Sequence, residues 1–169
     1  MFIAIVQHTP VWVWGLLAGL VALGLSQTRD REVSLPRVTI LPLVMIALSL
    51  SGVFSAFGHV PVAFGGWAAG IGAALAFGRQ FIAVRGATWS AQTATLHVPG
   101  SWLPLALIVG LFALKYFAGV SLSMHPQAAI DPAFAGPMCL AYGGFSGMFL
   151  ARALSLRAVT KHRAGLRVA

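Results

Sequence analysis

Five long apolar segments divide the 169 residues of this chain. A helix needs about 20 mainly apolar residues to cross the hydrocarbon core of a bilayer, so five crossings would use about 100 residues and leave only short connections. We therefore expect one integral membrane domain over residues 1–169, an all-α membrane protein with five transmembrane helices. The expected spans are residues 10–26, 38–57, 62–79, 102–121 and 133–152.

Positive charge is confined to alternate connections. Lys and Arg follow the first, third and fifth apolar segments, and the stretches after the second and fourth contain neither. Loops beside membrane helices carry their Lys and Arg on the cytoplasmic side. The pattern predicts a protein of the bacterial inner (plasma) membrane with its N-terminus outside and its C-terminus in the cytoplasm. The net charge of +8 has the same origin, so we expect no nucleic-acid binding.

Prolines mark the expected helix starts. Proline suits the first helical turn, where its missing N–H has no partner to lose. Residues of this kind stand at the start of each expected span: Pro10, Pro36, Pro61, Pro104 and Pro132.

The longest cytoplasmic connection has two interpretations. Apolar and polar residues alternate on both sides of a Gly- and Ser-containing middle, which indicates a β-hairpin at about residues 81–98. The alternative is that the third helix continues through Arg85 into an irregular loop.

Small residues recur at four-residue spacing in the third and fifth spans. Such stripes let helix backbones approach closely in membranes. They predict helix packing through Gly66, Gly70, Gly78, Gly143 and Gly147. The contact is expected either inside one bundle or across a homodimer interface.

Lys115 is the ionisable residue that falls inside an expected span. Such residues are functional candidates, so Lys115 and the adjacent Tyr116 are candidate substrate-binding residues. A lysine about 10 Å below the outer surface can also form a structural hydrogen bond inside the bundle or extend its ammonium to water, and we expect the ammonium to reach water.

Three histidines fall on the expected outer face and are candidate metal ligands: His8, His59 and His125. Their convergence would make a site for a transition metal or a haem. They lack the spacing of a metal motif, and Cys139 is the sole cysteine, so we expect no cofactor.

The C-terminal segment carries five basic residues between Arg152 and Arg167, interleaved with leucine and valine. A basic amphipathic extension binds the anionic lipids of the inner leaflet. We expect the segment to anchor the C-terminus on that surface.

The chain resembles a family of small bacterial inner-membrane proteins of unknown function, and it is distantly similar to the CcdC-type membrane proteins. The resemblance covers most of the chain and rests on the segments Pro99–Leu105, Lys115-Tyr116 and Leu41-Pro42-Leu43. It implies no activity and no functional residue.

The absence of carboxylates within the spans, of a phosphate loop and of a nucleophile–base pair argues against a cation-coupled carrier and favours a protein that is not an enzyme. The sequence therefore favours a membrane-embedded binding or transport-accessory protein. The alternative is a redox protein with a metal or haem at its outer face.

Overall fold

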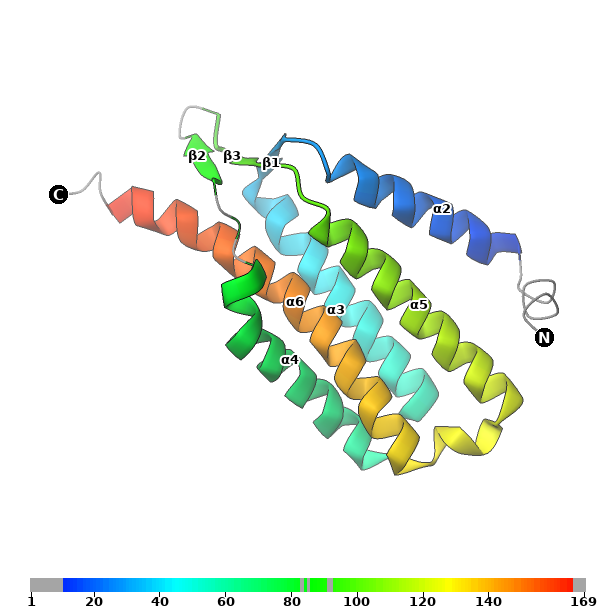
Figure 1. Ribbon diagram of the computed structural model, residues 1–169. Helices are drawn as coiled ribbons and strands as arrows, with labels where there is room; N and C mark the ends of the chain where they lie inside the picture. The colour runs from blue at the N-terminus through cyan, green and yellow to red at the C-terminus, as the bar shows by residue number, and fades with distance from the viewer. Residues whose placement is uncertain (1–10, 83, 85, 91–92, 166–169) are drawn as a thin grey trace.

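The computed structural model describes residues 11–82, 84, 86–90 and 93–165 (Figure 1). Helices make up most of the described chain, and a small sheet lies at one end of the bundle. In chain order the elements are α2 (Val11–Ser26), β1 (Arg31–Ser34), α3 (Leu35–Phe57), α4 (Pro61–Ile82), β2 (Thr88–Ser90), β3 (Thr95–Val98), α5 (Leu103–Met124), η1 (Pro126–Ala129) and α6 (Pro132–Gly165).

Four of the described helices are long and apolar enough to cross a membrane: α3, α4, α5 and α6. At 16 residues α2 is shorter, and its length of about 24 Å falls below the 30 Å of a typical hydrocarbon core. The several apolar helices agree with the expected membrane architecture. The count of five spans and their orientation stay predictions.

The helix starts lie close to the prolines. Pro61 and Pro132 are the first residues of α4 and α6, whereas Pro36 and Pro104 occupy the second positions of α3 and α5. Helix α6 runs on beyond the expected span of residues 133–152, through the basic residues to Gly165.

Helix α6 is the central element of the bundle, with α4 on one side and α3 and α5 on the other (Figure 1). Helix α2 lies along α5. The main core contains buried side chains from α3, α4, α5 and α6, among them Val53, Ala63, Leu107 and Cys139.

Glycines form the contact between α4 and α6. A Cβ atom at Gly66 would lie 2.8 Å from the carbonyl oxygen of Gly136, and one at Gly147 would lie 2.6 Å from the Cβ of Ala74. Gly70 and Gly143 face backbone atoms of the opposite helix even more closely. We call this contact the glycine seam, made by Gly66, Gly70, Gly143 and Gly147. Gly78 is buried further along α4.

A polar chain crosses the core beside the seam. The indole of Trp67 donates to Ser49 Oγ at 3.1 Å, and Ser49 Oγ donates to the carbonyl oxygen of Tyr142 at 3.3 Å. The contacts join α4, α3 and α6. Hydrogen bonds between helices are favoured where no water competes for the polar groups.

The sheet has the order β1-β3-β2, with both pairs antiparallel. The hairpin prediction is confirmed for β2 and β3, which pair from Thr88 opposite His97 to Ser90 opposite Thr95. Its first strand was placed wrongly, because Phe81 and Ile82 belong to the last turn of α4. Apolar residues at these positions fit both a helical and a strand pattern. The helix continues through them because this keeps their backbone N–H and C=O groups hydrogen-bonded.

Strand β1 was not expected from the sequence. It pairs with β3 from Arg31 opposite Val98 to Ser34 opposite Thr95. With Val33 as its only buried residue, β1 carries no periodic signal. The sheet and the end of α6 share a second core that includes Val33, Leu96, Val98 and Leu156.

Candidate functional site

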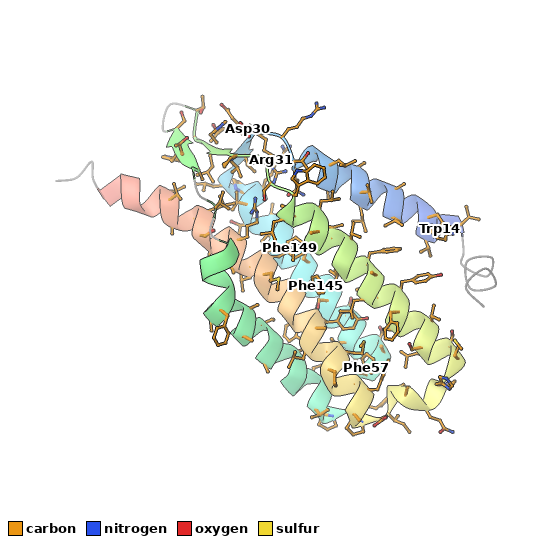
Figure 2. The ribbon with its side chains drawn as sticks, viewed as in Figure 1. Trp14, Asp30, Arg31, Phe57, Phe145 and Phe149 are labelled. Carbon is orange, nitrogen blue, oxygen red and sulfur yellow. The ribbon has the colours of Figure 1, made fainter. Side chains whose placement is uncertain are left out.

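A pocket of about 50 Å³ lies where the sheet meets the bundle. Its polar lining among the described residues consists of one amide and three guanidinium groups, and we call it the arginine pocket after Gln27, Arg31, Arg37 and Arg152. Figure 2 shows Arg31 at the sheet-bearing end, with Phe149 of the lining below it on α6. The remaining lining is apolar: Val33, Val38, Pro42, Val98, Pro104, Phe149, Ala153 and Leu156.

Two connections are tied together to form one wall of the pocket. The backbone N–H of Ser101 donates to the carbonyl oxygen of Gln27 at 3.0 Å, and that of Gly100 donates to Asp30 Oδ1 at 2.7 Å. A Cβ atom at Gly100 would overlap the carbonyl group of Thr28. Glycine is therefore required where the segment before β1 crosses the segment before α5.

Charge in the pocket is of one sign. Arg152 is only 9% exposed, and it lines the pocket together with the like charges of Arg31 and Arg37. Within the described residues, the one hydrogen bond of the three guanidiniums runs from Arg31 Nη2 to Gln27 Oε1, at 2.9 Å. A guanidinium has five N–H donors, so most of the donor capacity of the pocket is free.

Each Asp and Glu side chain of the described residues accepts a hydrogen bond from a group that is not an arginine. Asp30 accepts from Gly100, Glu32 accepts from Thr95, and Asp131 accepts from Ala133 at the start of α6. Burial lowers the pKa of Arg31 from its ordinary value. An arginine nevertheless stays protonated at neutral pH, so the positive charge of the pocket persists.

Two helix N-termini face this end. Arg37 and Val38 come from the first turn of α3, and Pro104 comes from the first turn of α5. Neither helix has an acidic residue in its first turn, and the side-chain partner at these two N-termini is Ser101 Oγ, which accepts from the backbone N–H of Leu103 at 3.3 Å. The free N–H groups and the helix dipole add positive potential there.

Lys115 lies away from this pocket, on α5. Its Nζ donates to the carbonyl oxygen of Leu48 near the middle of α3, at 3.2 Å. Gly52 leaves the space, since a Cβ atom there would lie 3.1 Å from that Nζ. The ammonium therefore turns onto a neighbouring helix, whereas we expected it to extend outward, because the carbonyl gives it a partner within the apolar zone. The ring of the neighbouring Tyr116 stacks with that of Phe112, with 6.3 Å between the ring centroids.

The histidines are not assembled into a cluster in the described part of the chain. His59 lies between α3 and α4 and His125 ends α5, both exposed, while His8 is outside the described residues. Among the described residues no group of three His, Cys, Asp or Glu side chains is placed to hold a metal ion.

From the sequence, the arginines of the pocket were interpreted only as indicators of membrane orientation, and Gln27 was not identified. It placed Arg152 in an anchor on the membrane surface, whereas the structure buries its side chain. A basic residue among apolar neighbours, as in Leu150-Ala151-Arg152-Ala153-Leu154, is a signal of burial that sequence reasoning could have used.

These features define a helical bundle with apolar helices of membrane-spanning length and a basic pocket at one end. The chain belongs to a family of unknown function, DUF6622, whose profile matches residues 1–167. This agrees with the family resemblance in the sequence, while the similarity to CcdC-type proteins stays a prediction. An uncharacterised protein of Pasteurella multocida (strain Pm70) is 32% identical over 62 residues, which cover 37% of this chain and 48% of that protein. No solved structure matches the chain.

Proposed function

We propose that this chain is a five-helix protein of the bacterial inner membrane, with its N-terminus outside and its C-terminus in the cytoplasm. It acts as a membrane-embedded binding protein rather than as an enzyme. The observation that carries the proposal is the arginine pocket, where guanidinium groups without carboxylate partners collect at one end of the apolar helices.

The distribution of charge supports the orientation. Arg29, Arg31, Arg37 and Arg152 lie at the end of the bundle that carries the sheet. The opposite end, from the α3–α4 turn and from η1 to the start of α6, contains no Lys or Arg. Positive residues beside membrane helices stay on the cytoplasmic side, so the sheet and the pocket would face the cytoplasm.

The chemistry of the lining supports binding over catalysis. One amide and three guanidiniums donate hydrogen bonds but do not exchange protons at neutral pH. The described lining also contains no hydroxyl or thiol that could act as a nucleophile.

Cysteine labelling tests the orientation. With Cys139→Ala as background, Ser123→Cys should react with a membrane-impermeant maleimide on intact spheroplasts, and Thr160→Cys should react only after permeabilisation. Ser123 is exposed near the end of α5, and Thr160 is near the opposite end of α6. Reaction of both cysteines from one side would mean that α6 does not cross the membrane and would contradict the proposal.

A further inference from the structure

We infer that the arginine pocket binds a phosphoryl group, carried either by a lipid head group or by a small soluble phosphate. The inference rests on the proposed function, because it takes the arginine pocket as the binding site. It adds the chemical class of the ligand.

The charge of the pocket requires an anion. Buried charges in proteins are paired, and an unpaired one is costly. Arg152 is 9% exposed and has no carboxylate partner among the described residues, and the other charges of the pocket lining are those of Arg31 and Arg37. The carboxylates of Asp30, Glu32 and Asp131 accept hydrogen bonds from other groups, so we take the counter-charge to come from an anion outside the chain.

The size of the pocket limits that anion. A water needs about 10–15 Å³ of cavity, so a pocket of about 50 Å³ holds a group of only a few heavy atoms. A phosphoryl group is of this size. The rest of a larger ligand would have to lie outside the pocket.

The geometry favours phosphate over carboxylate. The three guanidiniums come from different elements, Arg31 from β1, Arg37 from α3 and Arg152 from α6, so donors approach from several directions. A carboxylate offers two coplanar oxygens and one charge, whereas a phosphate monoester offers three acceptor oxygens and nearly two charges. Arginine forks match phosphate oxygens in pairs.

Two further features strengthen binding of this group. The first turns of α3 and α5 point N–H groups toward the same end of the bundle, and helix N-termini are favoured sites for phosphate. The apolar part of the lining, including Phe149 and Leu156, excludes competing water and so strengthens each ionic contact.

Two sources can supply the phosphoryl group at this position. Basic pockets between membrane helices on the cytoplasmic side hold lipid head groups. A soluble phosphate would reach the same guanidiniums from the cytoplasm. The experiment therefore needs one arm for each source.

Thermal unfolding of the full chain in neutral detergent measures binding, because a ligand of the folded state raises Tm with concentration. One arm adds inorganic phosphate against sodium chloride at equal ionic strength. The other adds phosphatidic acid to the micelles against phosphatidylcholine at equal mole fraction. We expect a rise in Tm that saturates in at least one arm, and the arm that saturates at the lower concentration identifies the source.

Arg152→Met tests whether the response comes from the pocket. It should weaken the apparent affinity by about tenfold or more, the equivalent of one lost charged hydrogen bond, and Arg152→Lys should fall between it and the wild type. Without ligand, Arg152→Met should unfold at the same or a higher temperature, because the substitution removes one of the like charges that repel each other in the pocket. The matched control is Arg157→Met on the exposed face of the same helix, which should respond as the wild type does.

The inference is overturned if Tm rises no more with phosphate than with sodium chloride, and no more with phosphatidic acid than with phosphatidylcholine. It is also overturned if Arg157→Met loses as much of the response as Arg152→Met does. The wild-type measurement decides the question even where a variant does not fold. Cysteine labelling at Ser123 and Thr160 is independent of binding. A correctly oriented protein without a phosphate response refutes this inference alone, and a response in a protein of opposite orientation refutes only the proposed topology.

Discussion

Helix α6 meets two different environments along its length. In its first half the glycine seam brings its backbone against α4, with Gly143 beside the carbonyl group of Trp67. In its second half the same helix presents Arg152 to the arginine pocket, which is built from the sheet, α3, α5 and the segment after α2. The first half makes a dense backbone contact with α4, and the second half encloses space among several elements.

The two halves of α6 show how a contact that packs two helices differs from a site that can bind a ligand. At the seam, small residues let two backbones meet in dense dispersion contact, and the space beside it, lined by Phe77, Leu140 and Met148, is apolar. In the pocket, the described side chains leave a volume of about 50 Å³ and guanidinium donors without partners. A site of unsatisfied charge persists because the rest of the bundle provides the stability that the pocket lacks.

The largest expected effect is at the seam. Gly143→Leu should destabilise the fold by about 3 kcal/mol or more, because the new side chain meets the backbone of Trp67, which cannot rotate away. Thermal or denaturant unfolding in detergent measures the change. Gly144→Leu is the matched control, since a Cβ atom at Gly144 meets nothing within 4 Å. Equal effects at the two positions would mean that the seam is not the dense contact described.

A smaller effect is expected at the wall of the pocket. Gly100→Ala should cost about 2 kcal/mol of stability, because its Cβ would overlap the carbonyl group of Thr28 and push two connections apart. It should also weaken the phosphate response, since those connections carry Gln27 and Arg31. The control is Gly119→Ala, at an open position in α5, which should be neutral or stabilising by up to about 1 kcal/mol. A loss of stability with an unchanged phosphate response would mean that the connection at Gly100 does not position the residues that bind phosphate.

The smallest expected effect concerns Lys115. Lys115→Met removes the hydrogen bond from Nζ to the carbonyl oxygen of Leu48 and should cost about 1 kcal/mol, within the range for such bonds in membranes. The loss stays small because Ser51 Oγ also donates to that oxygen, at 3.0 Å. Phe117→Met, an exposed site on the same helix, provides the baseline for unfolding measurements. A gain in stability in Lys115→Met would show that the ammonium is as poorly satisfied as the charges of the arginine pocket.

Much of the helical framework could be predicted from local sequence. Apolar length located four helices of spanning length, and prolines such as Pro61 and Pro132 marked where helices begin. The four-residue spacing of Gly143 and Gly147 indicated a backbone contact on one helix face. Each of these signals lies within one helix, where the rise and turn per residue are fixed, so spacing alone converts to geometry.

The sequence by itself determined the apolar helices and the separation of charge between the two ends of the helix bundle. Only the tertiary structure decided that Arg31, Arg37 and Arg152 share one pocket with Gln27, and that Lys115 reaches a carbonyl of α3. Residues 31 and 152 are far apart in the chain, and the first of them lies in strand β1, whose four residues carry no periodic pattern. The physical reason is that helix geometry is local, whereas a pocket forms from the relative placement of elements, which the packing of the whole bundle fixes.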